Sequence, residues 1–354
     1  MKEAIIKAGP KVEIHDIPIP KPGPDRIVIK VIVSGSNPKD WKVPEWMGME
    51  SNQGDDIAGY VHELGPGAAE YGFKVGDRVA AFHEMRTPGG SYAEYGLAWA
   101  HTTFHLPDKT PFEEGASLPL AVLTAAVGLY ARLGLPSPWT PTTKEIPLVV
   151  YGGAAAVGGY VIKYAQRSNI HPIIAVAGRG TSFVEGLIDR SKGDTIIDYR
   201  EGDEAVVKGI KDALKGKKLE YAYDAVSEKG SFTNICKVLE PNGHITLVLP
   251  GRDYSGIPDT VDKTTTSVGS VHVDGGKEQP AMYGFTQPDN RDLGYVHCQW
   301  LTRALKHGTF SGHPTEVVPG GLNGIEGALK NLKEGKASAV KYVFRIADTP
   351  GLSA

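Results

Sequence analysis

The residues of this chain with the clearest chemical purpose form a turn of small side chains between 152 and 159. In the segment PLVVYGGAAAVGGYVIKYAQRSNIHPIIAVAG, residues 147–178, an apolar strand ends at Tyr151, the turn follows, and an amphipathic helix leads into a second apolar strand. Such a unit presents backbone N–H groups and a helix N-terminus to a pyrophosphate, and small side chains let the backbone approach it. The pattern departs from Gly-x-Gly-x-x-Gly because Gly153 precedes three alanines, but the flanking strands and helix predict a dinucleotide site.

The end of the second strand indicates which dinucleotide is bound. Folds that bind NAD place an Asp or Glu there against the ribose hydroxyls, whereas folds that bind NADP often place an arginine against the extra phosphate. Here the strand ends Ala177-Gly178-Arg179, Ser182 follows, and no carboxylate occupies the position. Because a guanidinium can pair with a phosphate through two hydrogen bonds, the sequence favours NADPH. The alternative is that Arg179 lies in a loop and contacts only solvent.

The sequence contains no motif for a metal site or for a catalytic nucleophile. The eleven histidines form no His-Glu-x-x-His segment and no Cys/His cluster with the spacing of ligands, so we expect no metal site. No Gly-x-Ser-x-Gly segment is present, and we interpret Cys236 and Cys298, the two cysteines, as small buried apolar residues. Direct hydride transfer suits a dinucleotide pocket that has neither metal nor nucleophile, since the cofactor then supplies the chemistry.

The distribution of apolar runs and turn-forming residues along the chain predicts the elements that position these residues. In the first 110 residues, short alternating runs separated by turn clusters are typical of a small antiparallel barrel or sandwich. From about 120 onward, continuous apolar runs between helix-like segments, the last of them at 266–273, indicate buried parallel strands in a doubly wound α/β sheet. The tail is expected to form helices at 289–307 and 323–334, each followed by a strand, and to return to the first domain.

The composition narrows the class of protein. The 354 residues suit two domains, and a formal net charge of −3 with dispersed lysines and arginines argues against a nucleic-acid or membrane-surface partner. The most apolar stretch, residues 115–131, is too short for a membrane span and contains Pro119, so we expect a buried helix. The first residues lack the apolar core of a signal peptide, which favours the cytoplasm.

Four longer motifs carry a resemblance to a known family. They are SNPKDW at 36–41, GDDIAGYVHELG at 54–65, KVGDRVAAF at 74–82 and LPLAVLTAA at 118–126. With the glycine-rich turn, they resemble the medium-chain dehydrogenase/reductase superfamily, in its zinc-free quinone oxidoreductase and enoyl reductase branch. The resemblance implies a Rossmann domain, residues 120–275, inserted into a GroES-like domain made of residues 1–119 and 276–354. Zinc-dependent members carry Gly-His-Glu where this chain has Gly54-Asp55-Asp56, which implies that no zinc is bound; the alternative role for the two aspartates is structural hydrogen bonding.

The same resemblance implies a set of site residues in a cleft between the domains. Asn37 and Thr124 are expected near the nicotinamide, the turn from Gly152 to Val157 under the pyrophosphate, and Arg179 with two neighbours around the 2′-phosphate. The expected cofactor-binding residues are Asn37, Thr124, Gly152, Gly153, Ala154, Ala155, Ala156, Val157, Arg179, Ser182, Tyr199 and Leu249. Asn37, Asp40, Trp41 and Trp46 are the candidates for the catalytic cleft, and no residue stands out as the proton donor.

Within this branch, LGLPSP at 133–138 and the segment 221–250 look most like the fungal trans-acting enoyl reductases, which reduce an unsaturated thioester on a polyketide synthase. Three functions remain open at this point. The chain is a reductase of small enones, enals or quinones, a trans-acting enoyl reductase with a carrier-bound substrate, or a sensor or structural protein that binds NADPH with little turnover. Either a monomer or a homodimer is expected, the latter through a sheet edge at 266–273.

Overall fold

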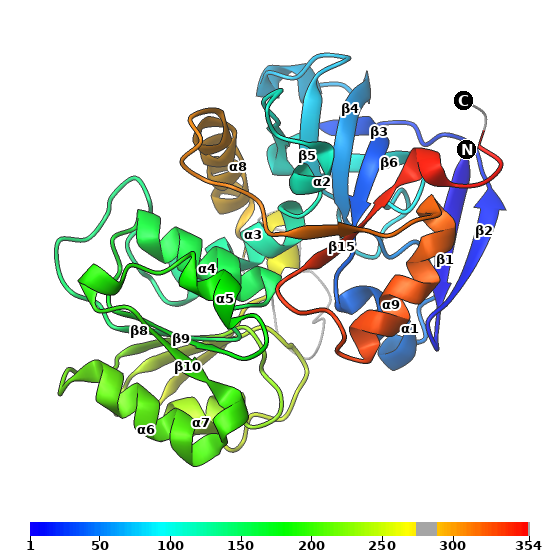
Figure 1. Cartoon of the computed structure of the whole chain (residues 1–354). Coiled ribbons are helices and arrows are strands. Elements are labelled where there is room, and N and C mark those ends of the chain that lie inside the picture. The colour runs from blue at the N-terminus through cyan, green and yellow to red at the C-terminus, as the bar shows by residue number, and fades with distance from the viewer. Residues whose placement is uncertain (274–288, 353–354) are drawn as a thin grey trace. The chain divides into compact units, whose positions relative to one another are not determined.

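The computed structural model of the chain describes residues 1–273 and 289–352 (Figure 1). Its contacts divide the chain into two compact units, Met1–Leu120 with Arg291–Ala354, and Ala121–Asn290. The first boundary expected from the sequence, between residues 119 and 120, differs from this division by one residue. The second expected boundary, between residues 275 and 276, lies outside the described residues.

A mostly antiparallel sheet organises the first unit. Its strands lie in the order β14-β15-β3-β4-β5-β7, β6 pairs with β3 off this path, and β1 and β2 form a separate hairpin. The C-terminal strand β15 pairs antiparallel with β3, so the two ends of the chain share one sheet. The elements of this unit are β1 (Lys2–Lys7), β2 (Lys11–Asp16), β3 (Arg26–Gly35), α1 (Lys39–Met47), β4 (Asp56–Leu64), β5 (Arg78–Phe82), β6 (Tyr95–Trp99), β7 (Thr103–His105), α2 (Phe112–Gly115), α8 (Arg291–Lys306), β14 (Thr315–Val317), α9 (Ile325–Lys333) and β15 (Lys341–Arg345).

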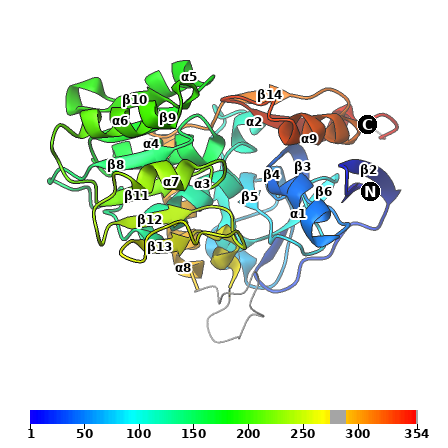
Figure 2. The ribbon, with the colours of Figure 1, turned by 90° about the horizontal axis from the view of Figure 1, so that it is seen from below.

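Six parallel strands form the sheet of the second unit, in the order β10-β9-β8-β11-β12-β13. The chain reverses its direction of winding between β8 and β11, so helix α4 lies on one face of the sheet and α6 and α7 on the other (Figure 1). Figure 2 shows β8, β11, β12 and β13 side by side. The elements of this unit are β8 (Leu148–Tyr151), α4 (Ala156–Arg167), β9 (Ile173–Ala177), α5 (Thr181–Glu185), β10 (Thr195–Asp198), α6 (Asp203–Leu214), β11 (Tyr221–Asp224), α7 (Ser231–Cys236), β12 (His244–Leu247) and β13 (Asp262–Thr265).

The central strands are apolar along their whole length because helices cover both faces of the sheet. Every residue of β8 and of β9 is buried. The doubly wound α/β sheet predicted from the continuous apolar runs is thereby confirmed.

One predicted strand is wrong. Residues 266–273, expected to form the last strand and a dimer edge, include a 3₁₀ turn at Val268–His272 instead of a strand. The last strand is β13, a polar segment Asp262–Thr265 that pairs with β12. Periodicity missed it because an edge strand with one partner does not need an apolar sequence. The apolar Val268 and Val271 are buried by the turn.

The apolar segment around residue 120 is a buried helix, as expected. It comprises α3 (Pro119–Ala126) and a following π-helical stretch, Val127–Arg132. By length and composition, Phe112–Arg132 is a candidate membrane span, but 83% of its most apolar window is buried inside the protein. Such burial is typical of a helix in a protein core.

Candidate active site

The residues expected at the dinucleotide gather at one edge of the parallel sheet. In a parallel sheet the carboxyl ends of all strands lie at the same edge, and ligands bind there beside the point where the winding reverses. That point lies between β8 and β11. The candidates follow successive strands at this edge: Gly152 after β8, Arg179 after β9, Tyr199 after β10 and Leu249 after β12.

The glycine-rich turn brings two backbone segments into close contact. Gly152 has a positive φ of 82°, and a Cβ at Gly158 would lie 2.2 Å from the carbonyl oxygen of Gly152. The turn leads into α4, whose N-cap Ala155 makes no side-chain hydrogen bond to the helix. The first N–H groups of a helix have no acceptor inside it, and no capping side chain competes for them here. This arrangement fits an anionic group such as a pyrophosphate.

Tyr199 and the segment at Arg179 are neighbours in the structure. A Cβ at Gly178 would lie 2.6 Å from the Tyr199 ring, so the ring packs directly on the backbone that precedes Arg179. The two positions are 20 residues apart in sequence, but β9 and β10 pair in parallel and bring Asp198 opposite Ala177. Arg179 and Ser182 are exposed, and 47% of Tyr199 is exposed. The three residues expected around the 2′-phosphate therefore lie on adjoining loops of one surface.

Asp224, at the end of β11, is a residue of this edge that the sequence reasoning missed. Its carboxylate accepts hydrogen bonds from the N–H of Val226 at 3.0 Å, the N–H of Ser227 at 2.8 Å and the hydroxyl of Ser231 at 2.5 Å. Burial raises the pKa of Asp224 to about 6, although these hydrogen bonds oppose the rise. Asp224 thus fixes the loop at Val226, where a Cβ on Gly152 would meet the Val226 side chain at 2.6 Å. The signal in the sequence was a lone carboxylate that ends an apolar strand.

Thr124 is buried on α3, and its backbone is fixed to the parallel sheet. Its carbonyl oxygen accepts a hydrogen bond of 2.9 Å from the hydroxyl of Tyr223, which lies on β11. One turn further along, Gly128 leaves room for the same ring, since a Cβ there would lie 2.2 Å from it. Leu249 is held in a similar way, because its carbonyl accepts the hydroxyl of Tyr254 at 2.7 Å.

Asn37, in the first unit, belongs to a buried network that spans most of the sequence. Its amide nitrogen donates to Asp56 at 2.6 Å, and its amide oxygen accepts from Lys341 at 3.1 Å. Lys341 also pairs with Asp56 at 2.6 Å, and the second oxygen of Asp56 accepts the N–H of Leu120 at 2.7 Å. Both oxygens of Asp56 are therefore used, and the orientation of the Asn37 amide is fixed. Lys341 is a second residue that the sequence reasoning missed.

Asp40 and Asp55 form another buried cluster, around Lys39. Asp40 accepts the hydroxyl of Tyr92 at 2.6 Å and the N–H of Asn37 at 2.7 Å, while Asp55 is ion-paired with Lys39. Burial raises the pKa of Asp40 and of Asp55 to about 6, and the charge of Lys39 opposes the rise in each. Asp40 has no exposed surface, so it supports the segment from within. The sequence analysis expected Asp40 to line a cleft, whereas its side chain is buried in the structure.

Trp41 and Trp46 lie on α1 with their rings in edge contact, 6.1 Å between centroids. The ammonium of Lys42 lies 5.6 Å from the Trp41 ring centroid and 5.0 Å from that of Trp46, within the range of cation–π attraction. Trp46 is 47% exposed. The pair forms an aromatic surface beside a positive charge.

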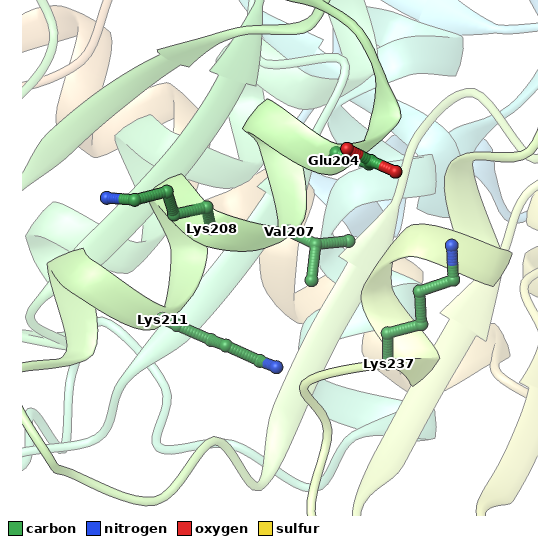
Figure 3. Close-up of a pocket in the computed structure, with 5 residues that line it drawn as sticks. All are labelled: Glu204, Val207, Lys208, Lys211 and Lys237. Carbon is green, nitrogen blue, oxygen red and sulfur yellow. The ribbon is translucent and has the colours of Figure 1, made fainter.

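A pocket in the second unit has a lining that includes none of the residues described above. It is lined by Glu204, Val207, Lys208 and Lys211 of α6 and by Lys237 (Figure 3). None of the expected site residues lines it, and we assign it no part in the site.

Comparison with known proteins identifies the class of protein to which the chain belongs. Residues 23–108 match the family of alcohol dehydrogenase GroES-like domains. The trans-enoyl reductase fsr4 of Gibberella fujikuroi is 50% identical over 329 residues, which are 92% of each chain. Among solved structures, the CurK enoyl reductase has a TM-score of 0.71 at 17% identity and covers 96% of this chain and 98% of its own. A mycobacterial protein complexed with NADPH has a TM-score of 0.70 at 20% identity, with coverages of 97% and 99%.

A GroES-like domain together with a Rossmann sheet defines a medium-chain dehydrogenase/reductase, an oxidoreductase that uses a nicotinamide cofactor. Within that class, this chain belongs to the family of the trans-enoyl reductases. The resemblance drawn from the sequence motifs is thereby confirmed, as is the expectation of a reductase, and a sensor or structural protein without turnover is set aside.

Proposed function

We propose that the protein uses NADPH to reduce the α,β double bond of an enoyl thioester, and that a separate synthase carries this thioester. The observation that carries the proposal is the 50% identity with a trans-enoyl reductase over 92% of each chain. The free state of the two cysteines, Cys236 and Cys298, suits a reducing compartment, and we assign the protein to the cytosol.

The edge of the parallel sheet supports the assignment of the cofactor. The turn Gly152–Val157 and the N-terminus of α4 would hold the pyrophosphate, while Arg179, Ser182 and Tyr199 would hold the 2′-phosphate. Thr124 and Leu249, whose carbonyls accept hydrogen bonds from Tyr223 and Tyr254, would lie at the nicotinamide end. When bound, the nicotinamide supplies the hydride that the β-carbon of the substrate accepts.

In the first unit, we assign Asn37 to the nicotinamide and the substrate carbonyl, and Trp41 with Trp46 to the conjugated part of the substrate. The amide of Asn37 keeps one N–H that neither Asp56 nor Lys341 uses, because Asp56 engages a single amide hydrogen. Conjugated planar groups stack well on aromatic rings. The α-carbon needs a proton after the hydride has been transferred, and we assign this proton to water.

We propose that this chemistry requires no zinc. Asp55 stands where zinc-dependent relatives carry a histidine, and its carboxylate is ion-paired with Lys39. In residues 1–273 and 289–352, no three His, Cys, Asp or Glu side chains are grouped so that they could hold a metal ion.

Replacement of Arg179 by alanine tests the choice of cofactor. Charge-assisted hydrogen bonds contribute roughly 1.5–3 kcal/mol, so Arg179→Ala should weaken NADPH binding by about 10- to 100-fold and NADH binding by much less. Both dissociation constants are measured by titration of nicotinamide fluorescence. Arg167→Ala, at an exposed arginine at the other end of α4, is the matched control and should change neither constant. Equal losses for NADPH and NADH in Arg179→Ala would disprove its phosphate role.

A further inference from the structure

Lys39 places its ammonium among three oxygen atoms of the first unit. Its Nζ contacts Oδ2 of Asp55, lies 3.2 Å from Oδ1 of Asp40 and donates to the main-chain carbonyl of Gln53 at 2.6 Å. The two carboxylates are fully enclosed, while the Lys39 side chain keeps 20% of its surface exposed. One positive charge therefore occupies a point from which two carboxylates and a carbonyl are all within reach.

Asp55 depends on this ammonium. Among the described residues, neither oxygen of Asp55 accepts a hydrogen bond, and Lys39 is its ion-pair partner. A buried carboxylate is costly without such a compensating cation. Lys39 in turn donates a hydrogen bond to the carbonyl of Gln53 and is ion-paired with both Asp55 and Asp40. The charge of the ammonium is therefore shared by the two buried carboxylates.

We propose that Lys39 is a built-in cation, which holds the position that a metal ion would take between Asp40 and Asp55 and so removes the need for a metal at these two carboxylates. The atoms around Nζ are all oxygens, which suit an ammonium group. Zinc, by contrast, prefers nitrogen and sulfur ligands. Lys39 is thus a positioning residue: it keeps Asp40 in place, and Asp40 accepts the N–H of Asn37.

A consequence is that the cluster becomes a binding site for a hard divalent cation once the ammonium is removed. Two carboxylates and a carbonyl, completed by water, are ligands that suit Mn²⁺ and Mg²⁺. Serine is the appropriate replacement because its short, neutral side chain removes the charge and leaves room for the ion.

The experiment is a titration of the purified full chain with Mn²⁺ at mildly alkaline pH, followed by the electron paramagnetic resonance signal of the free ion. Lys39→Ser should bind one Mn²⁺ with a dissociation constant of roughly 0.1–1 mM, the range of weak oxygen-ligated sites. The wild type should bind at least tenfold more weakly, and the double variant Lys39→Ser/Asp55→Asn should lose the gain. Lys74→Ala, which removes an exposed lysine paired with the single carboxylate of Asp77, is the control and should behave as the wild type.

Two outcomes would overturn the proposal: equal Mn²⁺ binding by Lys39→Ser and the wild type, or binding that persists without Asp55. If Lys39→Ser folds poorly, its thermal midpoint is measured against Mn²⁺ concentration. A rise by several degrees then supports the built-in cation, and a flat response contradicts it. Neither measurement uses NADPH or an enoyl substrate, so the result is independent of the proposed reaction.

Discussion

At the scale of the residue, the polar groups of the site are held by hydrogen bonds before any ligand arrives. Asp224 shows this most clearly, since three donors converge on a carboxylate that is fully buried. Its raised pKa has a consequence for stability. A carboxyl group whose pKa is higher in the folded state stabilises the fold at low pH, and that contribution is lost as the pH rises through the folded pKa.

Asp224→Asn should therefore change how stability depends on pH. A rise in the pKa of Asp224 from 3.8 to about 6 on folding corresponds to about 3 kcal/mol of stability at low pH. The wild type has lost this contribution by neutral pH. Asparagine stays neutral and can keep a similar set of hydrogen bonds. The free energy of unfolding of the variant relative to that of the wild type should thus increase by up to about 3 kcal/mol from pH 4 to pH 7. Denaturant unfolding across this range measures it, and parallel curves would refute the assignment.

The sequence could predict those site residues whose partners are close along the chain. The turn at Gly152 and the arginine at 179 stand out because a strand, a turn and a helix follow one another within about thirty residues. Lys341 could not be predicted in this way, since it lies 304 and 285 positions away from Asn37 and Asp56 in the sequence. Lys39 was visible inside the SNPKDW motif, but nothing local indicated that its charge turns inward.

At the scale of the element, β15 is attached to β3 both by the sheet ladder and by a buried charge. Lys341 lies at the start of β15 and neutralises Asp56, the first residue of β4. Removal of one partner of a buried ion pair leaves the other charge uncompensated, which costs far more than the loss of a pair in water.

Lys341→Met should accordingly lower the free energy of unfolding by about 3–5 kcal/mol. Lys330→Met, which breaks the exposed pair with Glu326 on α9, is the matched control and should cost less than about 1 kcal/mol. Urea unfolding of both variants gives the comparison. A cost below 1 kcal/mol for Lys341→Met would show that the pair does not stabilise the C-terminal strand.

Glycines inside helices provide a second test at this scale. Gly158→Ala in α4 places a Cβ 2.2 Å from the backbone oxygen of Gly152, whereas Gly327→Ala in α9 meets nothing within 4 Å. The first change should destabilise the protein by about 1–3 kcal/mol and weaken NADPH binding at least tenfold. The second should be neutral or stabilise by up to about 1 kcal/mol, as alanine favours helices. Unfolding midpoints and NADPH titrations decide, and equal behaviour of the two variants would contradict the close packing of the turn.

Most elements could be predicted from the sequence because periodicity reports burial. Strands β8 and β9 are buried at every residue and appear as unbroken apolar runs. The exception is β13, whose residues Asp262–Thr265 are half or fully exposed. Here the exposed edge strand has a polar sequence, and the 3₁₀ turn that follows it has an apolar one. Periodicity alone therefore assigns the strand to the turn.

At the scale of the whole molecule, each unit has a core of its own. The core of the first unit combines residues from both ends of the chain, such as Ala4 and Ile6 with Leu329 and Phe344. A buried apolar cluster of the second unit is drawn from residues between 149 and 261. The prediction that the tail returns to the first domain rested on the change in pattern after residue 285, and β15 bears it out by pairing with β3.

The central claim is that a hydride passes from NADPH to the β-carbon of an enoyl thioester on a separate carrier. It is tested most directly with NADPH that carries deuterium at both positions of the transferring carbon of the nicotinamide and with an enoyl thioester loaded on an isolated carrier domain, with a metal chelator present. Mass spectrometry should find one deuterium at the β-carbon of the reduced product and a solvent proton at the α-carbon. A product without deuterium, or turnover that stops with the chelator, would contradict the account.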